Sequence, residues 1–150
     1  RSTILGNSII VKLENLLDKA IKIAVDSHSG QTGKNGDPYI LHPLRMMFQL
    51  DTTEEKIVAV LHDTIEKTQV DYGYLEDAGF SEEILFAIDS LSRRPDEDYD
   101  SYIQRVSKNQ LATKVKIIDL HDNISSLGLK PKKMNSNDNL KYHRALEYLQ

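Results

Sequence analysis

The 150-residue sequence is long enough for one domain with a sizeable core, and its 39% hydrophobic and 28% charged residues are typical of a globular protein. Its 19 Lys and Arg residues are outnumbered by 23 Asp and Glu residues, and the net charge of −4 argues against a nucleic-acid partner. Cysteine is absent, which excludes disulfides, thiolate metal sites and cysteine nucleophiles. No apolar run approaches the roughly 18 residues of a membrane span, so we expect a cytoplasmic protein with no membrane partner.

Helical periodicity begins near the N-terminus. Apolar residues recur at spacings of three and four in residues 8–27, which predicts one long amphipathic helix. The glycine-rich stretch "SGQTGKNGDP", residues 29–38, predicts a loop, and a short helix follows at about residues 42–50. Thr53 is predicted to cap the next helix, which runs to about residue 67.

The second half of the chain continues the helical pattern. Residues 71–80 predict a short helix or a turn, and "SRRPDED" interrupts the periodicity. Four further helices are predicted, at about residues 81–91, 99–108, 110–127 and 137–149. The stretch "YDSYIQRV" within the second of these predicts ordinary helix packing. No segment predicts a strand, so the expected fold class is all-α, a compact helical bundle.

The stretch "LHDTIEKT", residues 61–68, places ionisable groups inside an apolar segment. On one continuous helix, His62, Asp63 and Glu66 fall in a single wedge beside the buried face. A solvated flank that happens to carry a histidine would explain the same pattern. The choice between these interpretations depends on whether histidines and carboxylates from other segments reach the same point.

The segment 110–127 is apolar around most of its circumference, so the helix is expected to be largely buried. One narrow stripe on it combines Lys116, Asp119 and Asn123. Charges on a buried helix are costly unless they are paired or bound to a ligand. An internal salt bridge between Lys116 and Asp119 is one interpretation; an anionic ligand at Lys116 and a cation at Asp119 is the other.

A third segment, "GKNGDPYILHP", leads to a histidine that faces inward at the start of a helix. Two imidazoles and two carboxylates are then available from three segments: His42, His62, Asp63 and Asp119. This set suits a divalent ion such as Mn²⁺ or Fe²⁺, with coordination positions left for water and substrate. Without thiolates, a closed structural zinc site is disfavoured.

The order of these residues resembles the H…HD…D pattern of the HD phosphohydrolase superfamily. Three longer stretches, "HSGQTGKNGDPYILHP", "VAVLHDTIEKT" and "KVKIIDLHDN", resemble the hydrolase domain of the Rel/Spo family, which degrades the alarmones ppGpp and pppGpp. The resemblance covers residues 8–127 and, more weakly, the helix at 137–149. It implies one HD-type hydrolase domain over residues 1–150, similar to a stand-alone small alarmone hydrolase.

The resemblance implies a metal-dependent enzyme that releases the 3′-pyrophosphate of ppGpp or pppGpp and leaves GDP or GTP. Its partner is then a small-molecule nucleotide, and its cofactor a divalent metal, Mn²⁺ first, with Fe²⁺, Zn²⁺ or Mg²⁺ as alternatives. The implied metal ligands are His42, His62, Asp63 and Asp119. The positions that match a nucleotide and pyrophosphate pocket are Lys34, Tyr39, Lys116 and Asn123. Glu66 matches a catalytic carboxylate that handles the attacking water. His28 matches a family histidine that lies near the site without being a metal ligand, and a surface histidine at a helix end is the alternative.

Three positions depart from the family pattern. Lys67 stands where the family has an aspartate, and a lysine would lower the basicity of Glu66. Gly33 stands where the family often has an arginine that stacks on guanine. In the late motif, Asp122 stands where the family usually has a histidine, and this chain has His121 one place earlier. Two alternative functions therefore stay open: an HD phosphohydrolase for a different nucleotide, and a weakly catalytic nucleotide-binding regulatory protein.

Overall fold

The computed structural model describes residues 2–128 and 136–150 of the chain. These residues form nine helices and no named strand, and one isolated antiparallel bridge joins Thr32 to Pro38. The helices are α1 (Ser2–Ser27), α2 (Leu41–Phe48), α3 (Thr53–Leu61), α4 (Thr64–Lys67), α5 (Tyr72–Asp77), α6 (Glu82–Leu91), α7 (Tyr99–Ser107), α8 (Gln110–Gly128) and α9 (Ser136–Leu149). The predicted all-α class is confirmed.

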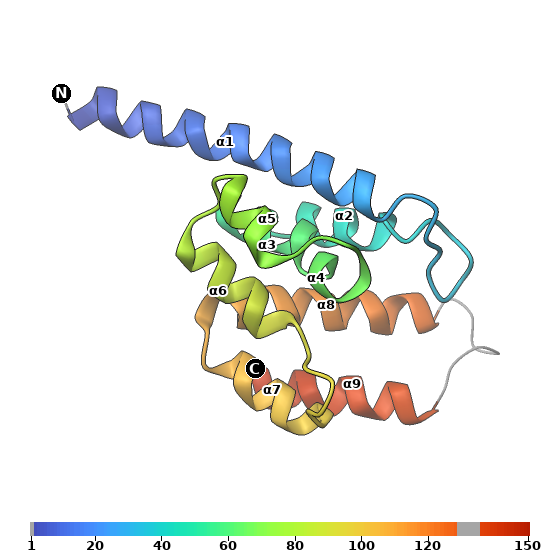
Figure 1. Cartoon of the computed structure of the whole chain (residues 1–150). Helices are drawn as coiled ribbons and strands as arrows, with labels where there is room; N and C mark the ends of the chain where they lie inside the picture. The colour runs from blue at the N-terminus through green and yellow to red at the C-terminus, as the bar shows by residue number, and fades with distance from the viewer. Residues whose placement is uncertain (1, 129–135) are drawn as a thin grey trace.

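The core is built around α3. Its residues from Ile57 to Leu61 are fully buried, because α3 packs against α1, α2, α6 and α8 at once. Figure 1 shows α1 along one side of the molecule and α7 and α9 at the opposite side, with α3 and α8 between them. A helix covered on every face needs apolar residues all round, and the "IVAVL" run of α3 supplies them.

The start of α3 differs from the prediction by one residue. The N-cap is Thr52, not Thr53, and its hydroxyl accepts a hydrogen bond from the backbone N–H of Glu55. The Glu55 carboxylate in return accepts from the backbone N–H of Thr52, which completes a capping box worth about 1 kcal/mol. Thr53 has the same side chain but lies inside the first turn, so the sequence alone could not separate the two.

The end of α3 also differs from the prediction. We expected one helix to about residue 67, but α3 ends at Leu61 and a separate α4 starts at Thr64. The Thr64 hydroxyl donates to the Leu61 carbonyl at 2.7 Å, and His62 Nδ1 lies 2.6 Å from the Ala59 carbonyl. These side chains take carbonyls that another helical turn would use, so the helix stops at the His62–Asp63 doublet.

The remaining helices follow the predicted pattern with small shifts. Residues 71–80, predicted as a helix or a turn, contain the short helix α5. Side-chain oxygens of Asp71, Ser81 and Asp98 cap α5, α6 and α7 by accepting backbone hydrogen bonds. The first helix starts six residues before the predicted position, at Ser2 instead of residue 8.

Within the described ranges, no helix has both the length and the apolar character needed to cross a membrane.

Candidate functional site

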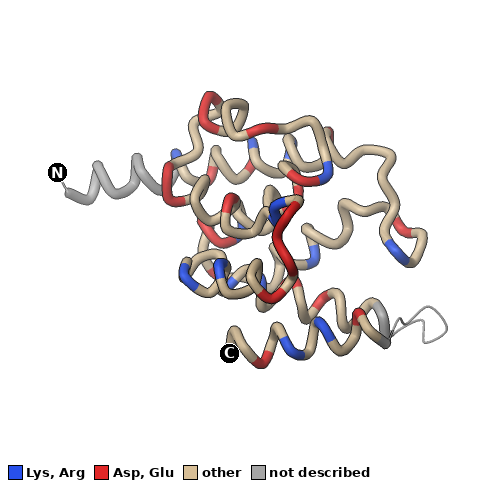
Figure 2. Tube along the Cα trace, turned by 60° about the horizontal axis from the view of Figure 1, so that its bottom comes forward, with Lys and Arg blue, Asp and Glu red and all other residues tan. Residues whose placement is uncertain are grey.

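A cleft of about 1140 Å³ opens between the loop after α1, the start of α4, the α6–α7 connection, α8 and α9. Acidic and basic residues are interspersed along the coloured part of the trace (Figure 2). The cleft differs from this average, because six Lys and Arg residues line it against four Asp and Glu residues. It is therefore a cation-rich site in a chain of net charge −4.

The loop between α1 and α2 is held by its own backbone. Gly33 N–H donates to Asp37 at 2.8 Å, and Tyr39 N–H donates to Gln31 at 2.9 Å. Gly36 sits at the turn with φ of +86°, a conformation that favours glycine. This closed loop presents its side chains, among them Lys34, to the cleft, whose lining includes both Lys34 and Tyr39.

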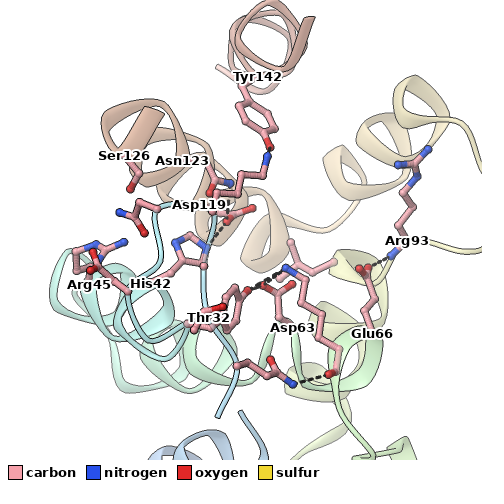
Figure 3. Close-up of a pocket in the computed structure, with 18 of the residues that line it drawn as sticks. Thr32, His42, Arg45, Asp63, Glu66, Arg93, Asp119, Asn123, Ser126 and Tyr142 are labelled. Carbon is pink, nitrogen blue, oxygen red and sulfur yellow. Dashed lines mark hydrogen bonds and ion pairs between the residues drawn. The ribbon is translucent and has the colours of Figure 1, made fainter. Parts of the chain in front are cut away.

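Three predicted ligands meet at the floor of the cleft. His42 from α2, His62 from the end of α3 and Asp119 from α8 each offer one donor atom, and these atoms lie within 4.8 Å of one another. His42 Nε2 is 2.8 Å from Asp119 Oδ1, and His62 Nε2 is 3.7 Å from the same oxygen. Asp63 extends the cluster, with its Oδ2 at 3.1 Å from His62 Nε2. Figure 3 shows His42 and Asp119 directed toward each other and Asp63 beside them.

The protonation of His62 indicates whether a cation fits this cluster. Its Nδ1 lies against a carbonyl oxygen, which can only accept, so Nδ1 carries the proton. Burial lowers the pKa of His62, which keeps the ring neutral and leaves a lone pair on Nε2. Among the described residues this buried Nε2 has no hydrogen-bond partner, although Asp63 and Asp119 face it. A lone pair and two carboxylates that face one another fit a divalent cation between them.

His42 is oriented by a second carboxylate that the sequence did not mark. Its Nδ1 lies 2.6 Å from Asp122 Oδ2, and Arg45 binds both Asp122 oxygens at 2.8 and 2.9 Å. Burial alone would raise the pKa of Asp122, but the hydrogen bonds from His42 and Arg45 lower it to about 2. A charged Asp122 fixes the ring with Nε2 toward Asp119, as an outer carboxylate does for a metal-binding histidine. Its spacing of three residues after Asp119 was the only sequence signal.

Besides His62, Asp63 contacts Tyr39 and Lys67. Tyr39 donates its hydroxyl hydrogen bond to Asp63 Oδ2, and the ammonium of Lys67 lies 3.4 Å from the same oxygen. Burial raises the pKa of Asp63 to about 6, against the opposing charge of Lys67. Tyr39 was predicted to line a nucleotide pocket; the structure places its hydroxyl on a predicted metal ligand.

The stripe on α8 contains the salt bridge that one interpretation expected. Lys116 Nζ lies 2.7 Å from Asp119 Oδ2, and both side chains are buried. Burial opposes the charge of Lys116, but Asp119 and the nearby Tyr102 and Tyr99 raise its pKa well above the usual value. Asn123 donates to Asp119 Oδ1 at 3.3 Å. Lys116 also lines the cleft, so the pair does not exclude a ligand there.

Glu66 lies on the wall of the cleft, at its exposed edge. Its Oε1 accepts a hydrogen bond from the backbone N–H of Arg93, so the α6–α7 connection orients the carboxylate. Figure 3 shows Glu66 and Arg93 together on one side of Asp63. A carboxylate in this place can act on a water molecule in the cleft.

The far wall of the cleft comes from residues that sequence reasoning missed. Lys34 donates to Tyr142 at 3.1 Å and to Asp138 at 3.3 Å, which joins the glycine-rich loop to α9. Lys141 lies over the Tyr99 ring at 4.5 Å. Tyr99, predicted to serve only helix packing, also lines the cleft. No local pattern in the sequence indicates this wall, because it joins residues more than a hundred positions apart.

His28 is buried, so the alternative of a surface histidine is wrong. Its Nδ1 lies 2.9 Å from Gln31 Oε1, and Gln31 Nε2 donates to the carbonyl of Lys67 at 2.8 Å. The His28 ring also packs against Tyr39, with ring centroids 4.9 Å apart. Burial lowers the pKa of His28, which favours a neutral ring. His28 thus contacts residues that reach the cluster and does not reach it itself.

Comparison with known proteins gives relatives named as ppGpp hydrolases and others named as putative GTP diphosphokinases. A guanosine-3′,5′-bis(diphosphate) 3′-pyrophosphohydrolase from Aquifex aeolicus is 27% identical over 123 residues, which is 74% of this chain and 18% of the relative. One from Borreliella burgdorferi is 39% identical over 80 residues, 50% of this chain and 12% of the relative. The bifunctional (p)ppGpp synthase/hydrolase SpoT of Escherichia coli is 28% identical over 134 residues, 78% of this chain and 19% of the relative.

A solved structure shares the fold of this chain. It comes from work on a metazoan ortholog of SpoT described as hydrolysing ppGpp, and it matches with a TM-score of 0.74 at 18% identity, over 89% of this chain and 82% of that chain. The predicted resemblance to the Rel/Spo hydrolase domain is confirmed. No family model matches the chain. The chain spans less than a fifth of the length of each of these three relatives. The match therefore supports the resemblance to the hydrolase domain and does not assign a relative's whole activity to this chain.

Proposed function

We propose that this chain hydrolyses the 3′-pyrophosphate of guanosine alarmones, ppGpp or pppGpp, to GDP or GTP and pyrophosphate. The observation that carries the proposal is the buried cluster of His42, His62 and Asp119, in which the unpartnered His62 Nε2 faces carboxylates at the floor of a cation-rich cleft. The relatives named for this reaction give the substrate class. We further propose that residues 1–150 make up one HD-type domain.

The metal site in this proposal consists of His42, His62, Asp63 and Asp119. Two imidazole nitrogens and two carboxylates suit Mn²⁺, with Fe²⁺, Zn²⁺ and Mg²⁺ as alternatives. When bound, such an ion supplies Lewis-acid chemistry, in which it offsets negative charge on a phosphate and makes a water molecule more acidic.

Side chains of the cleft have three tasks in this reaction. Glu66, oriented by the Arg93 N–H, positions or deprotonates the attacking water. Lys116 at the floor and Lys34 at the rim hold the pyrophosphate, and Lys141 from α9 adds a third ammonium to the lining of the cleft. Each ammonium stabilises the negative charge that develops on the leaving pyrophosphate.

The cleft offers no side chain at position 33 that could select guanine. Gly33 provides no side chain for stacking, and its backbone is occupied in the hydrogen bond with Asp37. A different nucleotide with a pyrophosphate arm would place the same groups against the metal site. This second candidate keeps the reaction and changes the base.

The test is pyrophosphate release by the metal-free protein, offered ppGpp with and without added Mn²⁺. We expect release only with the metal, reversible loss on chelation, and weaker restoration by Mg²⁺. A panel with pppGpp, GTP and the adenine analogue of ppGpp separates the two candidates. Tight nucleotide binding without turnover on every substrate would contradict both and favour a regulatory protein.

A further inference from the structure

The side chain of Lys67 turns back into the cluster. Its Nζ lies 3.1 Å from the Tyr39 hydroxyl, 3.4 Å from Asp63 Oδ2 and 4.6 Å from the centre of the Tyr39 ring. The side chain is 46% exposed, so one part of the ammonium's surroundings is the protein and the other is the cleft. From the sequence, the ammonium of Lys67 was expected to act on Glu66. In the structure it lies beside Asp63 instead.

This position is supported from two directions. On the four-residue helix α4, Asp63 at the N-cap and Lys67 are four positions apart, the spacing that brings two side chains together. The carbonyl of Lys67 accepts from Gln31, and Gln31 is held in turn by His28. The backbone of Lys67 is therefore fixed to the loop that also carries Tyr39.

Asp63 cannot serve two cations equally well. Its Oδ2 faces both the Lys67 ammonium and the His62 Nε2 lone pair, where the proposed metal ion would bind. Two positive charges on one carboxylate repel each other, so each weakens the binding of the other. When a metal ion takes Asp63, the ammonium loses its carboxylate partner and is left beside the cleft, where an anion restores the balance of charge.

We propose that Lys67 is a positioning residue that competes with the metal ion for Asp63 and thereby makes metal binding depend on an anion in the cleft. The proposal rests on the metal site described above. It gives this chain a property that a carboxylate at position 67 would not provide, because a carboxylate would attract the metal ion and repel the anion. Metal and anion then bind with positive coupling, which must be the same in both directions.

The test measures Mn²⁺ affinity by calorimetry on metal-free protein without substrate, in chloride buffer of fixed ionic strength. Lys67→Met removes the charge and keeps much of the side-chain length, whereas Lys67→Arg keeps the charge. We expect about tenfold tighter Mn²⁺ binding for Lys67→Met and an affinity within about twofold of the parent for Lys67→Arg. Equal or weaker binding by Lys67→Met would overturn the proposal.

A second arm adds sulfate as a tetrahedral dianion that complexes free Mn²⁺ only weakly. Sulfate should tighten Mn²⁺ binding to the parent severalfold and leave Lys67→Met nearly unchanged; an equal effect on both proteins would refute the coupling. Absence of Mn²⁺ binding in the parent would overturn the metal site together with this inference. Mn²⁺ binding that ignores position 67 would overturn the inference alone. A thermal unfolding transition for each variant shows that the comparison concerns folded protein.

Discussion

Within the described residues, the charged side chains around Arg105 and those around His62 differ in how well hydrogen-bond donors and acceptors match. Around Arg105 the guanidinium donates to both Glu97 oxygens at 2.8 Å and to the Ser92 carbonyl at 2.9 Å. Around His62 the acceptors dominate, since its buried Nε2 and the carboxylates beside it face one another. The first cluster is complete and ties the α6–α7 connection to α7. In the proposed metal site, a cation completes the second.

This difference separates a structural role from a binding role more clearly than burial does. Both clusters are charged and partly or fully covered, and both include carboxylates whose pKa is lowered, Glu97 to about 2 and Asp122 to about 2. A buried charge that has its partner within the fold stabilises the fold once desolvation is offset. A surplus of acceptors costs free energy in the absence of a ligand, and is retained where a ligand offsets that cost.

The largest expected effect comes from removing one of the proposed metal ligands, His62. His62→Ala should lower Mn²⁺ affinity by at least about a hundredfold and reduce pyrophosphate release to background. The reason is that each ligand of the proposed site fills one coordination position, and no other described side chain replaces His62. Metal content after dialysis, together with initial rates on ppGpp, measures both. His121→Ala provides the matched control, since this exposed histidine lies on α8 outside the cleft lining. Full metal occupancy in His62→Ala would refute the site.

The next effect separates the metal from the chemistry. Glu66→Gln keeps the hydrogen bond from Arg93 but removes the charge, so metal affinity should hold while kcat falls about 10²-fold or more. Steady-state kinetics with saturating Mn²⁺ measures the rate. Glu83→Gln, an exposed change on α6, should leave the rate unchanged. A Glu66→Gln enzyme as fast as the parent would remove Glu66 from the mechanism.

The Arg105 cluster should respond in the opposite way. Arg105→Met removes the guanidinium hydrogen bonds to Glu97 and to three backbone carbonyls, which should reduce the free energy of unfolding by about 2–3 kcal/mol. Mn²⁺ affinity of the folded variant should equal that of the parent. Urea unfolding and calorimetry measure the two quantities. The control is Lys22→Met, which removes an exposed pair with Asp26 and should cost less than about 0.5 kcal/mol. A loss of metal binding in Arg105→Met would mean that the clusters are not independent.

The sequence predicted those features that depend on local spacing. The apolar periodicity located the helices, and the order of His42, the His62–Asp63 doublet and Asp119 marked residues that the fold brings within a few ångströms. These predictions succeed because a charged residue inside an apolar run needs an explanation wherever the chain folds. The roles assigned to the residues remain predictions.

Features that depend on tertiary contacts could not be predicted in this way. The contact of Asp122 with His42 spans 80 positions and that of Lys34 with Tyr142 spans 108. The local spacing of Asp119 and Asp122 puts both on one face of a helix but does not indicate that Asp122 meets His42. The break between α3 and α4 depends on which carbonyl each side chain takes. The direction of Lys67 follows from that break, since a short α4 starting at Thr64 sets where its last residue points.

The smallest expected effect is a pH dependence of stability that belongs to the Arg105 cluster. The hydrogen bond from Arg105 is the largest cause that lowers the pKa of Glu97 from 4.5 to about 2. A pKa that is lower in the folded state adds stability above the unfolded pKa, and this stability is lost as pH falls toward the folded pKa. After discounting for screening at the surface, the contribution is about 1–2 kcal/mol at neutral pH, with more than about half of it lost by pH 3.

The measurement compares the free energy of unfolding of the parent and Glu97→Gln from pH 7 to pH 3. The glutamine variant has no carboxylate to protonate, so the gap between the two proteins should be widest at neutral pH and should narrow between about pH 4.5 and pH 3. When Glu97→Gln is added to the Arg105→Met protein, it should change the free energy of unfolding less, and with a weaker dependence on pH. The reason is that Glu97 has then lost the hydrogen bond that lowers its pKa most. A gap between parent and Glu97→Gln that stays constant over this range would show that the ion pair does not set the pKa, and that the two clusters differ less than their hydrogen bonds indicate.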